Sequence, residues 1–189
     1  MKKRAIFISG KQGSGKSTLA NKLEEMLWQS PIEPVRMKFA DPIYSLHDGI
    51  WDFIETCGLK KKKCLPKGET VDGRLLQLLG TEWGRTMMPN IWANILRKRL
   101  EDIEGRKLAI IDDCRFPNEL NVMTRGFSLR VRLECIEGIR RDRAEKWRHD
   151  VDHISETALD GREEYFDVVF DSGLTSTQSM AEKIIPLIL

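Results

Sequence analysis

The chain has few of the residues that build metal or disulfide sites. Its 189 residues include four cysteines and three histidines. Cys57 and Cys64 stand too far apart for one half of a zinc site, no second half-site accompanies them, and the histidines are scattered. We therefore expect free thiols, which are usual in a reducing cytosol. The formal net charge is only +2, which argues against a general nucleic-acid surface.

Long apolar runs are also missing. No run approaches the roughly 20 residues of a membrane-spanning helix. The basic start Met1–Arg4 leads straight into the first predicted strand, without room for a signal peptide. We expect a cytoplasmic protein without a membrane or a stable nucleic-acid partner. Residues 1–189 are expected to form one domain, since 41% hydrophobic and 32% charged residues are ordinary for a globular chain.

The most informative stretch is a glycine-rich segment between an apolar run, 5–8, and an amphipathic run, 19–27. Its spacing, G-x-x-x-x-G-K-S between a strand and a helix, is that of a P-loop. Glycines let backbone N–H groups close around phosphate oxygens, and the N-terminus of the following helix favours the same anion. Lys16 is expected to bind the β- and γ-phosphates of ATP, and Ser17 to bind Mg²⁺. The predicted ATP-binding residues are Gly10, Gly13, Ser14, Gly15, Lys16, Ser17 and Thr18.

Apolar strand patterns alternate with amphipathic helix patterns along the chain. The strands are expected at 4–9, 35–40, 107–111, 128–134 and 167–171, and the main helices at 15–27, 42–57, 74–80, 91–104, 117–125 and 176–189. No repeat or linker divides this series. The alternation predicts an α/β fold with a mainly parallel sheet.

Acidic residues follow the second apolar strand, predicted at 107–111. P-loop folds use an aspartate at the end of such a strand to place a carboxylate beside Mg²⁺. We expect Asp112 or Asp113 to act on the water shell of the metal.

Two basic segments remain open to two interpretations. Residues 136–150 carry four arginines, either as a solvated helix or as a lid that closes over the transferring phosphoryl group. In the second case Arg140 and Arg143, three residues apart, share one face of a helix and point into the cleft. Lys60–Lys63 and the turn after them are either a solvated loop or a mobile rim that attracts phosphate-bearing substrates.

With these residues located, the chain resembles the phage-type deoxynucleoside monophosphate kinases, within the wider nucleoside monophosphate kinase group. The P-loop is shared by very many NTPases, so four further stretches carry the resemblance. They are Phe39-Ala40-Asp41-Pro42-Ile43, the run from Arg74 to Glu82 together with Trp92, the run from Asp113 to Glu119, and His153-Ile154-Ser155-Glu156. They occur in the order of the family and cover most of the chain, from residue 4 to about residue 173.

The resemblance implies a P-loop NTPase fold of three layers with a five-stranded parallel core, a lid near 136–156 and a monophosphate-binding region near 38–100. It implies transfer of the γ-phosphoryl group of ATP, with Mg²⁺, to a deoxynucleoside 5′-monophosphate, giving the diphosphate for DNA precursor synthesis. A homodimer is compatible with it.

The same resemblance suggests roles for individual residues. Arg74, Arg85 and Arg115 are candidates to bind the acceptor phosphate, and Trp83 or Trp92 to stack on its base, although Trp92 also fits the apolar stripe of a core helix. The substrate-binding set is Lys11, Asp41, Arg74, Trp83, Arg85, Trp92, Arg115 and Glu156, the catalytic set is Lys16, Arg140, Arg143 and Asp113, and the metal set is Ser17 and Asp112. The chain departs from the family at Tyr44, where relatives often carry lysine, so Lys11 or Lys38 is the candidate replacement.

Two other functions use the same P-loop. A kinase of another small metabolite, or of polynucleotide 5′ ends, shares the ATP half of the site. The polynucleotide version needs a continuous basic groove, against which the modest net charge argues. A P-loop switch or ATP-dependent binding protein needs a group that positions water and a larger interaction surface. The arginine-rich segment and the separate acceptor-side cluster favour the kinase.

Overall fold

Five parallel strands form a single sheet in the computed structural model, which describes residues 4–60, 65, 70–123, 127–144, 147 and 154–189. The strands are β1 (Ala5–Gly10), β2 (Glu33–Met37), β3 (Lys107–Cys114), β4 (Ser128–Glu134) and β5 (Val168–Asp171). Their order across the sheet is β2-β3-β1-β4-β5, and every neighbouring pair is parallel. The prediction of an α/β fold with a five-stranded parallel sheet is confirmed.

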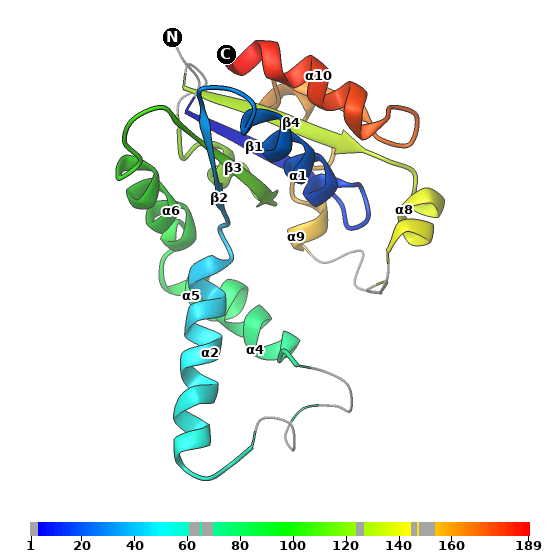
Figure 1. The fold of residues 1–189 in the computed structure, drawn as a ribbon. Helices are drawn as coiled ribbons and strands as arrows, with labels where there is room; N and C mark the ends of the chain where they lie inside the picture. Colours follow the sequence, from blue (N-terminus) through cyan, green and yellow to red (C-terminus); the bar gives the residue numbers. More distant parts are fainter. Residues whose placement is uncertain (1–3, 61–64, 66–69, 124–126, 145–146, 148–153) are drawn as a thin grey trace.

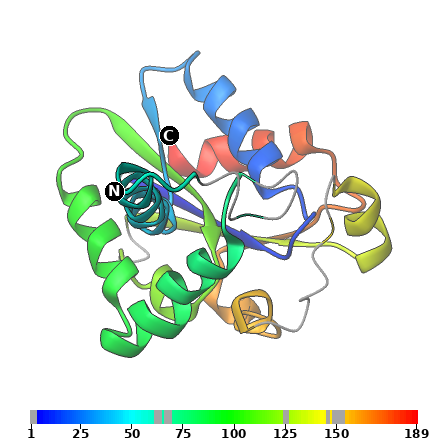
Figure 2. The same ribbon diagram turned by 90° about the horizontal axis from the view of Figure 1, so that it is seen from below.

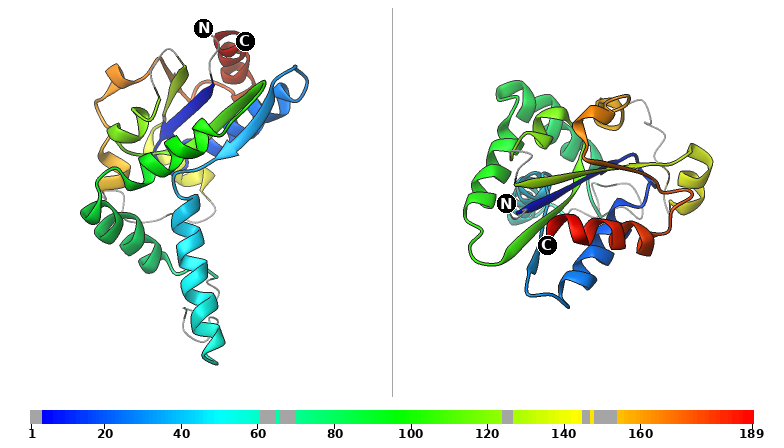
Figure 3. Two further views of the ribbon diagram at one scale, coloured as in Figure 1. Left: turned by 90° about the vertical axis from the view of Figure 1, so that its left-hand side faces the viewer. Right: turned by 90° about the horizontal axis from the view of Figure 1, so that it is seen from above.

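Helices cover both faces of this sheet (Figures 1 and 3). Successive residues of β1 point to opposite faces. Ile6 and Ile8 pack with α1 (Lys16–Leu27) and α10 (Thr177–Ile188), whereas Ala5 and Phe7 pack with α6 (Ile91–Glu101). All four of these strand residues have no exposed surface, which explains why the central strand is continuously apolar. The three layers follow from this double burial.

Strand β3, which lies beside the central strand β1, and the helix after it differ in length from the prediction. The strand continues to Cys114, so Asp112 and Asp113 belong to the strand instead of following it. Helix α7 covers only Pro117–Leu120, because Asn121 and Val122 donate to carbonyls three residues back, a tightened last turn that ends the helix. The predicted continuation toward residue 125 is wrong as far as residue 123.

An arm projects from the carboxyl edge of the sheet (Figure 1). It consists of α2 (Asp41–Thr56), which Figure 2 shows almost along its axis, and of a return path through α4 (Gly73–Gln77), the π-helix η1 (Leu78–Trp83) and α5 (Gly84–Met87). Helix α2 contacts both α4 and η1. The arm lies within the region that the resemblance assigns to the monophosphate.

The predicted end of a helix at Gly80 is wrong, because helical structure continues through it. A Cβ at Gly80 would lie 3.1 Å from Ile43 Cδ1, and one at Gly84 would lie 2.5 Å from the ring of Trp92. Both glycines therefore serve close packing of the return path rather than termination. The indole Nε1–H of Trp92 donates to the carbonyl of Gly80 over 2.8 Å, within the π-helix.

The remaining helical segments are short. Helix α8 (Glu137–Arg143) ends where Ala144 becomes extended, and α9 (Ile154–Thr157) is followed by the 3₁₀ turn η2 (Glu163–Tyr165). The rest of the predicted lid, at 145–146 and 148–153, lies outside the described residues, as do Lys61–Lys63.

Disulfides and membrane-spanning helices can be assessed for the described residues. Cys57, Cys114 and Cys135 are free thiols, as predicted, and Cys64 lies outside the described residues. No helix within those ranges is long and apolar enough to cross a membrane.

Candidate nucleotide-binding site

The glycine-rich loop joins β1 to α1 at the carboxyl edge of the sheet. Gly13 and Gly15 have φ angles of 76° and 88°, in the left-handed region that favours glycine. A Cβ at Gly13 would lie 2.3 Å from the carbonyl oxygen of Arg140, so the loop also needs glycine there for close approach. Gly15 precedes the first turn of α1, whose N–H groups have no side-chain cap. Such a helix start, free of capping side chains, is suited to bind an anion.

The predicted ATP-binding residues come together in this loop and in the first turn of α1. Ser14 is fully buried, whereas Ser17 and Thr18 are exposed. The ammonium group of Lys16 donates to the carbonyl of Lys11 over 2.9 Å, so the side chain folds back across the loop. Their role in ATP binding stays a prediction.

Two cations and two carboxylates surround the buried ammonium group of Lys16. The pKa of this group is lowered from 10.5 to about 7, mainly by burial and also by Arg115 and Arg132, while Asp112 and Asp113 raise it. A phosphate group bound here would add negative charge beside the three cations. Arg132, only 3% exposed on β4, was not singled out from the sequence. Its signal was an arginine between two apolar residues of a predicted strand, Val131 and Leu133.

The two aspartates of β3 have different surroundings. One carboxylate oxygen of Asp112 accepts from Arg36 Nη2 over 2.9 Å, and the other is buried without a hydrogen-bond partner among the described residues. The carboxylate of Asp113 instead accepts from the backbone N–H groups of Phe39 (3.0 Å) and Ala40 (2.9 Å). Burial raises the pKa of Asp113 to about 7. Asp113 thus holds the chain between β2 and α2, with both oxygens engaged, which argues against the catalytic role expected for it.

The residues present fit a magnesium ion. Mg²⁺ keeps several water ligands and takes one or two groups from the protein. No cluster of three or more His, Cys, Asp or Glu occurs in the part of the chain that the structure describes. The exposed hydroxyl of Ser17 and the unpartnered oxygen of Asp112 are the oxygen donors that such a partly hydrated ion needs.

Arg115 and Glu156, expected to bind substrate, meet each other beside the loop. Arg115 Nη1 donates to Glu156 Oε1, and Glu156 Oε2 accepts from the backbone N–H of Gln12 over 3.0 Å. Lys11 forms an ion pair with Asp160 (2.6 Å), which also binds Arg132 (3.1 Å). The sequence analysis missed Asp160, and no local pattern marks it.

The two candidate lid arginines face protein groups rather than an open cleft. Arg140 Nη1 donates to the carbonyl of Gln12 over 3.1 Å, and its side chain is 7% exposed. Arg143 Nη2 donates to the carbonyl of Ser172 over 3.0 Å. Helix α8 is thus packed on the loop, and the lid role of both residues stays a prediction.

Three of the expected substrate residues are engaged elsewhere. Arg85 lies 2.5 Å from Glu119 Oε1 and 3.8 Å from the centre of the Phe116 ring, so its charge already has a buried partner. The carboxylate of Asp41 pairs with Arg99 (2.9 Å) and accepts from the N–H of Lys38 (3.0 Å), at the start of α2. Trp92 is 1% exposed. It has no free face for a base, so of its two roles the core position is correct and the stacking role is wrong.

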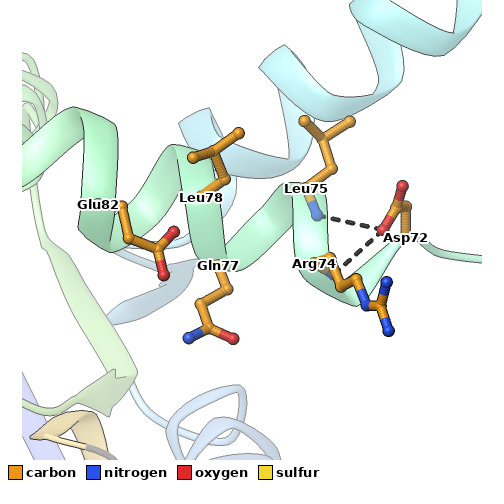
Figure 4. Close-up of a pocket in the computed structure, with 6 residues that line it drawn as sticks. All are labelled: Asp72, Arg74, Leu75, Gln77, Leu78 and Glu82. Carbon is orange, nitrogen blue, oxygen red and sulfur yellow. Dashed lines mark hydrogen bonds between the residues drawn. The ribbon is translucent and has the colours of Figure 1, made fainter.

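A groove runs along α4 and η1, with a volume of about 490 Å³. It is lined by Asp72, Arg74, Leu75, Gln77, Leu78 and Glu82. Figure 4 shows Leu75 and Leu78 on one side of the helical path and the polar side chains of Arg74, Gln77 and Glu82 on the other. Trp83, the next residue, is 46% exposed. Gln77 and Glu82, which sequence reasoning did not select, thus join Arg74 and Trp83 on the arm.

No protein-family model and no curated protein matches the chain. Solved structures do match it. A shikimate kinase from Acinetobacter baumannii in complex with shikimate has 13% identity and a TM-score of 0.55, covering 98% of this chain and 93% of its own. An APS kinase from Mycobacterium tuberculosis, in complex with AMPPNP and APS, also has 13% identity and a TM-score of 0.55, with 98% and 97% covered. A shikimate kinase from Bacteroides thetaiotaomicron has 16% identity and a TM-score of 0.53, with 97% of both chains covered.

At these identities the likeness concerns the fold alone. It extends over nearly the full length of each of these kinases. The chain has the fold of the P-loop kinases.

Proposed function

We propose that the protein transfers the γ-phosphoryl group of ATP to a deoxynucleoside 5′-monophosphate. One observation carries the transfer: Lys16 folds over a glycine loop in a cluster of cations, with Arg115 and Arg132 near enough to lower its pKa. Charge of this kind stabilises a phosphoryl group in transit, for which alignment and charge neutralisation are the main needs. The resemblance of the motifs supports the choice of acceptor.

The described residues supply the donor side of this reaction. Lys16 and the N–H groups of the loop bind the β- and γ-phosphates, and Ser17 with Asp112 holds Mg²⁺. When bound, the metal neutralises charge on the phosphate oxygens. Arg140 and Arg143 close on the transferring group when both substrates are present, and closure excludes water that would compete as acceptor.

The arm supplies the acceptor side. Arg115, beside the loop, is the main candidate for the acceptor phosphate. It is paired with Glu156, but its side chain is 36% exposed, whereas that of Arg85 is 18% exposed and paired with the buried Glu119. Lys11 or Lys38 takes the place of the lysine that relatives carry where this chain has Tyr44. Arg74, Gln77 and Glu82 in the groove, with the exposed ring of Trp83, offer hydrogen bonds and a stacking surface to a base.

A kinase of another small metabolite is the second candidate. The solved structures of this fold that contain shikimate and APS favour it, because their acceptors are small molecules. The groove on the arm and the arginine-rich α8 are features expected of a kinase with its own acceptor. A P-loop switch, in which water would be the acceptor, is therefore the weaker alternative.

The test is ADP formation from ATP and Mg²⁺, measured separately with dTMP, dGMP, dCMP, dAMP, their ribose counterparts, shikimate and APS. Stimulation by one or more deoxynucleotides, absent in Lys16→Ala, is expected. Stimulation by shikimate or APS alone would establish the metabolite kinase. Slow ADP formation that no acceptor changes would overturn the proposal in favour of a switch.

A further inference from the structure

The backbone of Gln12, at the tip of the glycine loop, is held from two sides. Its N–H donates to Glu156 Oε2 over 3.0 Å, and its carbonyl accepts from Arg140 Nη1 over 3.1 Å. The next residue, Gly13, lies directly against the backbone of Arg140, where a Cβ has no room. The loop that binds the nucleotide in the proposed function is therefore positioned by α8 and by α9, which both lie near it in Figure 1.

Glu156 has a second contact on its other oxygen. Arg115 Nη1 donates to Oε1, and the same nitrogen lies 3.5 Å from the carbonyl of Ser155. The Glu156 side chain is 15% exposed, so the carboxylate is largely withdrawn from water and needs both partners. Charge-assisted hydrogen bonds of this kind are stronger than neutral ones.

Arg115 also belongs to the phosphate site. It follows β3 directly, and its charge acts on Lys16. Glu156 therefore connects a group on the acceptor side of the site with the backbone on the nucleotide side. Asp160 holds Lys11 in a similar way, but its second partner is Arg132, a buried residue of the sheet, so Asp160 connects the loop only to the core.

We propose that Glu156 is a positioning residue that couples the binding of the two substrates, by holding Arg115 and the tip of the glycine loop in one arrangement. The inference rests on the proposed function and deepens it. One carboxylate can hold both partners only when Arg115 and Gln12 are both in place. A ligand that orders either partner therefore favours the arrangement that the other ligand needs, and the coupling is positive and reciprocal.

The experiment measures the affinity of Mg·AMPPNP by calorimetry, without acceptor and then with saturating dTMP or dGMP. In the wild-type protein we expect the acceptor to tighten AMPPNP binding about fivefold or more, within the usual range of coupling between sites. In Glu156→Gln, we expect AMPPNP alone to bind several-fold more weakly, and the effect of the acceptor to fall to nearly none. Glu156→Asp keeps the charge but is too short for both contacts, and should also lose the coupling.

Glu137→Gln is the matched control, because Glu137 forms an exposed ion pair with Arg141 on α8 and does not contact the loop. Thermal unfolding of each variant separates the proposal from a purely structural role, which would lower stability and leave the affinities unchanged. Unchanged AMPPNP affinity and unchanged coupling in Glu156→Gln would overturn the inference, while activity with a deoxynucleotide would still support the proposed function. If the wild-type protein binds dTMP or dGMP but its AMPPNP affinity stays the same, the inference is overturned. If it binds none of dTMP, dGMP, dCMP and dAMP, the acceptor assignment fails, and so does the coupling that rests on it.

Discussion

Replacement of Gly13 by alanine tests the contact between the glycine loop and α8. The φ angle of 76° costs a non-glycine residue about 1–2 kcal/mol. The new Cβ would lie 2.3 Å from the carbonyl oxygen of Arg140, and relief of such overpacking typically costs about 1–3 kcal/mol more. If α8 moves to make room for the Cβ, the hydrogen bond from Arg140 to the carbonyl of Gln12 is weakened as well.

Gly15→Ala is the internal control for this prediction. Gly15 has a φ angle of 88°, and a Cβ there has nothing within 4 Å, so its replacement costs the backbone strain without the collision. We expect Gly13→Ala to lower the free energy of unfolding by about 1–3 kcal/mol more than Gly15→Ala. In a chain of this length that difference is roughly 2–12 °C in Tm.

The assay is thermal unfolding of the nucleotide-free proteins, followed by circular dichroism at neutral pH. Without nucleotide, the readout reports packing of the loop and not loss of ligand contacts. Equal Tm values for the two variants would refute the close packing of α8 on the loop. They would also weaken the case that Arg140 and Glu156 hold the loop tip together.

Three further predictions concern other positions. Lys16→Ala should abolish transfer. The pKa of Lys16 is about 7 in the folded protein and ordinarily 10.5, so between these pH values the folded protein binds fewer protons than the unfolded chain, and its stability should rise with pH. Urea unfolding at pH 7 and pH 9 should show a smaller rise in the variant. Trp92→Phe leaves the Gly80 carbonyl without its donor and should cost about 1–3 kcal/mol in urea unfolding; no loss would show that the contact is unimportant. Arg143→Ala should lower kcat by orders of magnitude in the ADP assay, as expected for an arginine on the transferring group, and an unchanged kcat would exclude Arg143 from the lid role.

Most strands were predictable because they carry apolar residues that helices cover. β2, with the sequence EPVRM, spans Glu33–Met37, whereas 35–40 was expected. β1 and β4 lie within one residue of their expected bounds. The ends of other elements were harder to predict from the sequence. β3 runs on through Asp112 and Asp113 because one carboxylate binds Arg36 and the other binds the backbone of Phe39 and Ala40, contacts between segments far apart in the chain.

Candidate site residues also differ in whether local sequence or distant contacts determine their role. The glycine loop was readable because its function depends on consecutive residues, with glycine where φ is positive and lysine and serine at fixed spacing. Trp92 was ambiguous because a helical stripe does not reveal what covers it, and its indole proved to be buried. Arg85 was expected to bind the acceptor phosphate, but its charge is paired with Glu119, a contact that the sequence does not show.

By itself, the sequence determined the parallel α/β architecture and the P-loop, since both follow from periodicity and from spacing within a few residues. Only the tertiary structure decided which charges are left to act on a ligand. Asp113 and Arg85 are engaged by partners, Asp112 keeps one oxygen unpartnered among the described residues, and Glu156 holds Gln12 and Arg115 together. A charged side chain can act on a ligand only if no other group of the protein already pairs with it. The groups that pair with it come from distant parts of the chain.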